Sequence, residues 1–163
     1  MRAWGVRAVG STPAPRFLHP SATLCTLLTV LRRLDHTGFA VAELEPAIAL
    51  FRDTLGARVG PVFEDPLQRV RLCFAEYDGG RVELVAPWGE DSPVSRLVAE
   101  RGGAYHLCYE TDDLEGDFER LRAGGFVPTS VPQPAVAFGG RRVVFLFSRV
   151  AQLIELVEAP NGA

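Results

Sequence analysis

The stretch Asp35-His36-Thr37-Gly38-Phe39-Ala40 returns further along the chain as Tyr105-His106-Leu107-Cys108-Tyr109-Glu110. Eight positions after each histidine stands the dipeptide Leu-Glu, at Leu44-Glu45 and at Leu114-Glu115. The chain has three histidines, and two of them occupy the same place in this pattern. The correspondence indicates an internal repeat, so we expect two copies of one structural unit.

Each copy predicts a strand, a helix and three further strands. The histidine lies in a short alternating strand, and residues 44–55 and 114–121 carry apolar side chains at helical spacing. Glycine follows both helices, as a left-handed C-terminal position prefers. The later strands are expected at 58–63, 70–77 and 81–86 in the first copy and at 126–131, 142–147 and 152–157 in the second.

The segment between the copies predicts a linker helix. Asp91-Ser92-Pro93 precedes residues 94–101, which is typical of a helix start with a capping residue and a proline at the first helical position. The expected fold class is therefore α+β, with two tandem βαβββ modules. Module one is expected at 34–88, the linker helix at 89–103, module two at 104–158 and a tail at 159–163.

The first 33 residues differ from the rest of the chain. They contain no Asp or Glu, carry five arginines and are interrupted by three prolines. Targeting segments have this kind of composition, but the apolar run 23–31 is too short to span a bilayer. We expect residues 1–33 to be a disordered or extraneous extension.

Composition and missing motifs restrict the functional classes. A formal net charge of −3 and a pI near 5.6 argue against a nucleic-acid partner, and no segment predicts a membrane span. GxSxG, Walker and GxGxxG motifs are absent. Cys73 and Cys108 lie in apolar runs without CxxC spacing, which favours reduced, buried thiols and a cytoplasmic protein.

Two glutamates stand in the middle of apolar strands, within Val82-Glu83-Leu84 and Ile154-Glu155-Leu156. A carboxylate that is buried alone is costly, so each of them needs a partner. If the modules pack about a pseudo-twofold axis, the two glutamates and the two repeated histidines converge. Imidazole and carboxylate together suit Zn²⁺, Co²⁺, Ni²⁺, Mn²⁺ or Fe²⁺. The alternative interpretation makes the histidines hydrogen-bonded core residues and leaves the glutamates facing solvent.

Several stretches carry a resemblance to a known family: 34–41, 66–70, 82–87, 91–94, 101–106, 139–146 and 153–156. Over residues 34–158 the chain resembles the vicinal oxygen chelate superfamily, and within it most closely the methylmalonyl-CoA epimerases. The resemblance implies a cupped mixed β-sheet around a divalent metal ion. It also implies that the ligands are His36, Glu83, His106 and Glu155.

Three positions depart from the pattern of that family. Arg69 stands where glycine is usual, and Leu72 stands where some epimerases have a second catalytic glutamate. Residues 147–149 replace a His-Pro-Lys run. These departures lie on the substrate side of the implied site, so the substrate is expected to be methylmalonyl-CoA or a relative of it.

The function that follows is metal-assisted proton abstraction beside a carbonyl, which epimerises a 2-substituted acyl thioester through an enolate. Glu155 is the expected catalytic base, and Glu83 or a water returns the proton on the other face. The expected substrate-binding residues are Gln68, Arg141 and Arg142, although the two arginines also fit a solvated hairpin turn. The expected partners are an acyl-CoA and a second copy of the chain in a homodimer.

Three other activities on the same fold compete with this prediction. A glyoxalase I-type lyase uses a two-His, two-Glu site on a thiol hemithioacetal. Metal-free drug-binding resistance proteins typically lack the full set of ligands. An extradiol dioxygenase needs two histidines and one glutamate around Fe²⁺, and Glu83 would fill the position that it keeps open.

Overall fold

The computed structural model describes residues 31–150 and 152–160, which form a mixed sheet with one helix of each copy packed on its outer face. Eight strands follow one another in the order β2-β4-β5-β1-β6-β10-β9-β7, while β3 pairs with β4 and β8 pairs with β9. The strands are β1 (Arg33–Ala40), β2 (Arg58–Val59), β3 (Phe63–Asp65), β4 (Val70–Tyr77), β5 (Gly80–Pro87), β6 (Gly103–Thr111), β7 (Val127–Pro128), β8 (Gln133–Pro134), β9 (Arg142–Ser148) and β10 (Gln152–Glu158). The helices are α1 (Leu44–Ala49), which continues as a π-helical turn η1 (Leu50–Thr54), α2 (Ser95–Glu100), α3 (Leu114–Ala123) and the 3-10 turn η2 (Val136–Phe138).

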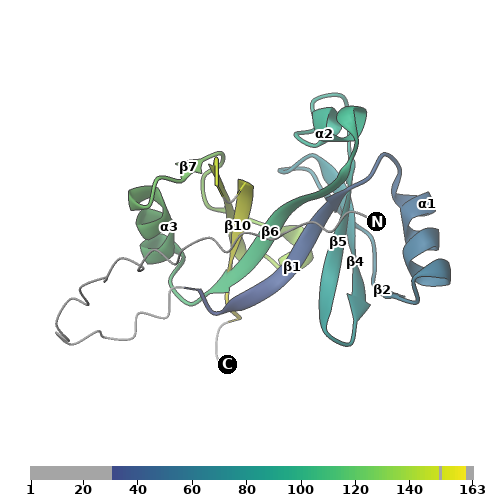
Figure 1. Cartoon of the computed structure of the whole chain (residues 1–163), viewed down its shortest axis with the longest axis horizontal. Helices are drawn as coiled ribbons and strands as arrows, with labels where there is room; N and C mark the ends of the chain where they lie inside the picture. The colour runs from purple at the N-terminus through teal and green to yellow at the C-terminus, as the bar shows by residue number, and fades with distance from the viewer. Residues whose placement is uncertain (1–30, 151, 161–163) are drawn as a thin grey trace, which may run out of the picture.

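The two copies of the repeat meet at the antiparallel pair β1–β6, which runs through the middle of the sheet (Figure 1). On each side of this seam, the first strand of a copy pairs in parallel with its last strand, β1 with β5 and β6 with β10. The remaining strands continue antiparallel toward the two edges. The strand order is therefore the same when it is read outward from the seam in either direction. The predicted α+β class with tandem modules is confirmed.

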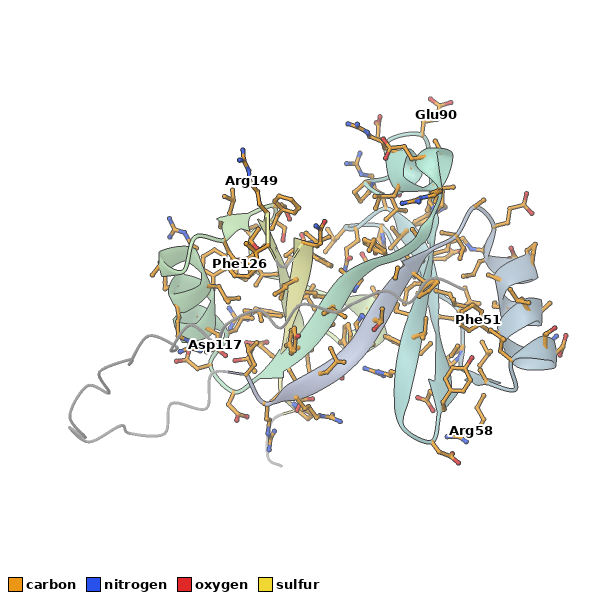
Figure 2. The ribbon with its side chains drawn as sticks, in the orientation of Figure 1. Phe51, Arg58, Glu90, Asp117, Phe126 and Arg149 are labelled. Atoms are coloured by element: carbon orange, nitrogen blue, oxygen red, sulfur yellow. The ribbon has the colours of Figure 1, made fainter. Side chains whose placement is uncertain are left out.

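The outer face of the sheet is covered by one helix from each copy. Leu84 of β5 packs with Leu44 of α1, and Leu156 of β10 packs with Leu114 of α3. The two helices lie at opposite ends of the sheet (Figure 1). The π-helical turn places Phe51 between helix and sheet (Figure 2). Because each helix buries its apolar side against its own half of the sheet, the inner face is left for a shared core.

The inner face holds a core to which both copies contribute. Its buried side chains alternate along the strands with those that face the helices, as period-two geometry requires. They include Leu72, Phe74 and Val85 from the first copy and Val143 and Val157 from the second. The functional side chains described below project from this same face.

Residues 31–33 belong to the fold, which corrects the expected domain start at residue 34. Strand β1 begins at Arg33, and Leu31 packs against the core beneath α3. The amide of Arg32 donates to the Glu110 carbonyl at 2.8 Å. The remainder of the expected extension, residues 1–30, lies outside the described residues.

Proline positions explain where the strand predictions were wrong. Of the expected strand 126–131, only Val127–Pro128 forms a strand, β7, and the separate short strand β8 follows after an irregular segment. Pro128, Pro132 and Pro134 cannot donate to a ladder, so a continuous strand is excluded there. The expected strand 58–63 is likewise divided, into β2 and β3, around Gly60-Pro61.

The linker helix forms, but its start differs from the prediction. Helix α2 begins at Ser95, with Val94 at the N-cap position and no side-chain cap. Asp91 and Pro93 therefore lie in the turn before the helix rather than at its first positions. Among the described residues no helix is long and apolar enough to cross a bilayer. Cys73 and Cys108 are free and buried, as predicted.

Candidate metal centre

A matched pair of β-bulges shapes the two strands that carry the histidines. The ladder between β1 and β6 shifts register before His36, which leaves Asp35 without a partner, and shifts again beyond Gly38, which leaves Tyr105 without one. Asp35 and Tyr105 each precede a histidine, so they are equivalent positions of the repeat. A bulge re-aims a side chain. It brings Asp35 beside His36 and lets Tyr105 line the same cavity as the inner-face residues.

Four buried side chains meet at the seam, one from each of four neighbouring strands: His36 of β1, Glu83 of β5, His106 of β6 and Glu155 of β10. His36 Nε2 lies 3.0 Å from His106 Nε2, 3.3 Å from Glu83 Oε2 and 3.4 Å from Glu155 Oε2. His106 Nε2 lies 3.1 Å from Glu155 Oε2 and 3.6 Å from Glu83 Oε2. The structure thus brings together the four side chains that the sequence predicts as ligands.

These separations fit a divalent cation. Two ligand atoms bound at about 2.0–2.2 Å stand about 3.0–3.6 Å apart when the angle between them is roughly 90–120°. Glu155 Oε2 is buried and has no well-formed hydrogen bond among the described residues. A buried carboxylate oxygen in that situation needs a cation. Two imidazoles and two carboxylates are donors that suit Zn²⁺, Co²⁺, Ni²⁺ and Mn²⁺.

Asp35 fixes the orientation of His36. Its Oδ1 lies 2.8 Å from His36 Nδ1, and Arg81 Nε donates to the same oxygen at 3.1 Å. Burial opposes ionisation of Asp35, but the hydrogen bonds from His36 and Arg81 outweigh burial and lower its pKa to about 2. An ionised carboxylate can only accept, so His36 Nδ1 carries the proton and the lone pair of Nε2 faces the other three donors.

The centre has a strong preference for positive charge. Burial disfavours the protonated form of His36, but the charge of Glu83 and the bond to Asp35 outweigh it and raise the pKa of His36 well above its usual range. Burial also opposes ionisation of Glu155, and the two neighbouring imidazoles overcome this and lower its pKa. A metal ion and a proton compete for the same lone pairs, so metal binding here would release protons.

Gly38 and Cys108 occupy equivalent positions of the repeat, and each faces the histidine of the other copy across the seam. A Cβ atom at Gly38 would lie 2.0 Å from the His106 ring, so the ring position requires glycine there. Cys108 lies against His36 and Asp35. Burial raises the pKa of the Cys108 thiol well above its usual range. Cys108 is not among the four side chains that converge at the centre.

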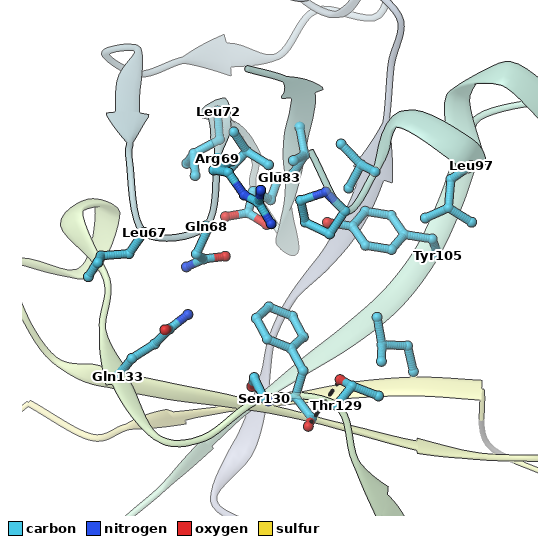
Figure 3. Close-up of a pocket in the computed structure, with 16 residues that line it drawn as sticks. Leu67, Gln68, Arg69, Leu72, Glu83, Leu97, Tyr105, Thr129, Ser130 and Gln133 are labelled. Carbon is cyan, nitrogen blue, oxygen red and sulfur yellow. Dashed lines mark hydrogen bonds between the residues drawn. The ribbon is translucent and has the colours of Figure 1, made fainter. Parts of the chain in front are cut away.

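A cavity of about 270 Å³ opens beside Glu83, one of the four donors (Figure 3). Glu83 contributes to its wall, and Tyr105 and Phe145, which also line it, contact the His106 ring with centroid distances of 4.5 and 5.6 Å. Most of the remaining lining is apolar, and both copies of the repeat contribute: Leu67, Leu72, Val85, Val94, Leu97 and Leu153 are examples. The metal centre therefore lies at one wall of a largely apolar cavity, the usual setting of a small-molecule site.

Gln68 lines this cavity, as a substrate-binding residue must, whereas the structure does not bring Arg141 or Arg142 to it. Arg141 Nη1 donates to the Glu158 carbonyl at 2.6 Å. Arg142 forms an ion pair with Glu158 and donates to Glu115 Oε1 at 2.6 Å. Both arginines thus join the end of β10 to neighbouring parts of the second copy.

Sequence reasoning missed several polar residues of the cavity, among them Tyr105, Gln133, Thr129 and Ser130. Strict alternation would place Tyr105 on the face opposite to His106, and the bulge reverses this. Burial raises the pKa of Tyr105 well above its usual range, so its hydroxyl stays protonated and can donate a hydrogen bond. Thr129 and Ser130 lie in the irregular segment after β7, and Gln133 lies in the two-residue strand β8, which is too short for periodicity to report side-chain direction.

Comparison with known proteins places the chain in context. Residues 35–145 match the family model described as the glyoxalase/bleomycin resistance protein/dioxygenase superfamily. An ethylmalonyl-CoA/methylmalonyl-CoA epimerase of Cereibacter sphaeroides is 34% identical, over 72% of this chain and 89% of the relative. A lactoylglutathione lyase of Haemophilus influenzae is 30% identical, over 76% of this chain and 90% of the relative.

Solved structures of methylmalonyl-CoA epimerases are similar to this chain as well. A methylmalonyl-CoA epimerase from Mycobacterium tuberculosis superposes with a TM-score of 0.72 and 30% identity, over 85% of this chain and 94% of the other. A methylmalonyl-CoA epimerase in complex with methylmalonyl-CoA and NH₄⁺ gives a TM-score of 0.69 and 28% identity, over 80% of this chain and 96% of the other.

Proposed function

We propose that this chain, which belongs to the glyoxalase/bleomycin resistance protein/dioxygenase superfamily, is a metal-dependent epimerase of methylmalonyl-CoA or a similar 2-substituted acyl thioester. The observation that carries the proposal is the convergence of two buried histidines and two buried carboxylates beside a cavity. The identity to epimerases of that name and the likeness to an epimerase solved with methylmalonyl-CoA support the substrate class.

We further propose that His36, Glu83, His106 and Glu155 bind one divalent ion, Co²⁺, Zn²⁺, Ni²⁺ or Mn²⁺. Such an ion acts as a Lewis acid that stabilises negative charge developing on a carbonyl oxygen. Around it, the apolar walls keep water away from the reacting carbon, and the Tyr105 hydroxyl donates to an oxygen of the substrate. Gln68 binds a polar group of the substrate from the opposite side of the same cavity.

The proton at C2 requires a base on one face and a donor on the other. Glu155 and Glu83 come from different copies of the repeat, so they approach the centre from the two sides of the seam. The neighbouring imidazoles lower the pKa of Glu155, so its carboxylate is unprotonated at neutral pH and can accept a proton. Glu83 lines the cavity, which suits return of the proton, directly or through a water.

Hydrogen–deuterium exchange at C2 tests this function. Metal-loaded protein is incubated with methylmalonyl-CoA in D₂O, and deuterium incorporation is followed by mass spectrometry. The wild type should exchange, and Glu155→Gln and Glu83→Gln should each lose about 10²-fold or more, as for a lost general acid or base. Metal content is measured for every variant because both residues are also ligands. Glu76→Gln, an exposed change on β4, is the matched control and should exchange normally.

A second candidate function is a lyase that acts on a thiol hemithioacetal. The identity to a lactoylglutathione lyase and the same two-His, two-carboxylate centre favour it over a metal-free binding protein. Turnover of the methylglyoxal–glutathione hemithioacetal, with no C2 exchange of methylmalonyl-CoA, would assign the lyase. Absence of bound metal after reconstitution with each of the four ions would remove both enzymes.

Assembly and location are proposed on separate grounds. We propose a cytoplasmic protein, because the buried and unpaired Cys73 and Cys108 suit a reducing compartment. We propose a homodimer, because Leu34 and Leu107 of the two central strands expose apolar surface that a second copy can cover. Sedimentation equilibrium of the purified chain tests the second proposal.

A further inference from the structure

One residue at the cavity has a backbone conformation that L-amino acids avoid. Arg69 has a φ of 54°, in the left-handed region where a side chain crowds the neighbouring carbonyl. Among the described residues one other non-glycine shares a positive φ, Gln152 at 62°. Strained residues persist where the surroundings impose the conformation, and they are concentrated at functional sites.

Hydrogen bonds on both sides of Arg69 impose its conformation. Before it, the amides of Leu67 and Gln68 both donate to Asp65 Oδ1 at 3.0 Å. Asp65 is fully buried and is also tied to the second copy, because Val136 N donates to its Oδ2 at 3.3 Å. On the other side, the amide of Trp88 donates to the Arg69 carbonyl at 3.0 Å. The turn is therefore built into the fold, and any residue at this position must adopt the left-handed conformation.

The turn directs the Arg69 side chain to the cavity beside the metal centre. Arg69 and Gln68 lie together over it, and Gln133 faces them from the other wall (Figure 3). Among the described residues that line this cavity, Arg69 is the one with a permanent positive charge, while Glu83 contributes a carboxylate. Its ion pair with Asp91 is long, at 3.7 Å, and Asp91 is 89% exposed. Such a surface pair contributes little, so it does not account for an arginine at a position that suits glycine.

We propose that Arg69 binds an anionic oxygen group of the thioester substrate and thereby selects charged acyl thioesters. This inference rests on the proposed function, because the substrate class comes from there. A malonyl-type thioester offers two groups of this chemistry, the free carboxylate of its acyl part and the phosphates of its coenzyme. A guanidinium suits either, since its planar donors match carboxylate and phosphate oxygens in pairs. Arg69 is 54% exposed, so it meets the substrate at the mouth of the cavity.

The test compares Arg69→Gly, Arg69→Lys and Gln152→Gly with the wild type. Arg69→Gly removes the cation and relieves the backbone, whereas Arg69→Lys keeps the cation and the left-handed residue. Gln152→Gly is the matched control, because it relieves the same kind of backbone conformation at a residue that does not line this cavity. KM and kcat are measured by C2 exchange, dissociation constants by calorimetry and Tm by scanning calorimetry.

Arg69→Gly should raise the KM and the dissociation constant for methylmalonyl-CoA about tenfold or more, the effect of one lost charge-assisted hydrogen bond. Its kcat should change little, and its Tm should stay the same or rise by a few degrees. Arg69→Lys should recover most of the affinity. Gln152→Gly should likewise keep or raise Tm and should leave KM unchanged. A merely structural arginine would give the opposite result, a lower Tm and an unchanged KM.

Methylmalonyl-pantetheine, which retains the carboxylate and lacks the nucleotide phosphates, separates the two anionic groups. If Arg69→Gly still raises its KM, the carboxylate is the partner; if the effect is lost with this substrate, a phosphate is. An Arg69→Gly protein that binds methylmalonyl-CoA as tightly as the wild type overturns the inference. Failure of the proposed function looks different, because the wild type then shows no C2 exchange while calorimetry still reports whether binding depends on Arg69.

Discussion

Gly38 shows how a single residue decides whether the metal centre can form. The His106 ring occupies the space that a side chain at Gly38 would take, since an added Cβ would lie 2.0 Å from the ring. A side chain at position 38 would therefore displace the His106 ring away from the other three donors. The sequence marks Gly38 as part of the repeat, but its role depends on the cross-seam pairing with His106, which no local pattern contains.

Gly38→Ala should therefore weaken metal binding by about 10–100-fold, the range seen when the support of a metal ligand is lost. Affinity is measured by competition with a chromophoric chelator. Gly79→Ala is the matched control, because nothing lies within 4 Å of an added Cβ there, and it should bind as the wild type does. Wild-type affinity in Gly38→Ala would mean that His106 is not a ligand in the position described.

Asp35 acts on the metal centre through His36 and is a positioning residue. Its ionised carboxylate holds the Nδ1 proton of His36, and Arg81 holds the carboxylate. Asp35→Asn removes the charge while keeping the shape, so metal affinity should fall about 10–100-fold. Asp78→Asn, which changes a 99% exposed carboxylate, controls for the change in net charge. An Asp35→Asn protein with unchanged affinity would show that His36 needs no such support.

At the scale of elements, sequence periodicity predicted the regular helices and strands, and it failed at bulges and irregular segments. Both helices and the histidine and glutamate strands were predicted because their apolar spacing follows from helix and strand geometry. The bulges at Asp35 and Tyr105 were not predicted, because a bulge is visible only in the pairing of two strands and not in the sequence of one strand. The four candidate ligands could be predicted because the repeat places one histidine and one strand glutamate in each copy. Most of the polar residues of the cavity lie in irregular segments, so their positions could not be predicted from periodicity.

The two N-caps of the module helices offer a matched comparison of local stabilisation. Asp113, before α3, accepts a hydrogen bond from the Gly116 amide at 3.0 Å. Glu43, before α1, makes no side-chain cap. Asp113→Ala should therefore cost about 1 kcal/mol of unfolding free energy, while Glu43→Ala should change it by less than about 0.5 kcal/mol. Urea denaturation measures both, and equal losses would contradict the assignment of the cap.

At the scale of the whole molecule, the metal centre and the fold depend on the same seam. Each copy supplies one histidine and one glutamate, and the inner core is shared between the copies. Neither module has the four donors by itself. An ion bound here therefore joins the two halves of the sheet, and its binding free energy should appear as stability of the whole domain.

Metal should accordingly raise the unfolding temperature of the chain in a concentration-dependent way. At a free metal concentration 100 times the dissociation constant, the expected gain is about 2.7 kcal/mol, or roughly 5–10 °C for a chain of this size. Calorimetry with Co²⁺ and with EDTA measures the difference, and one transition is expected because the core is continuous across the seam. His106→Ala should abolish the metal-dependent gain, whereas Glu100→Gln, an exposed change on α2, should keep it. His106→Ala leaves only one histidine and two carboxylates at the described centre, so the ion should no longer bind tightly there. If metal still raised the unfolding temperature of this variant, the stabilising ion would bind elsewhere on the protein.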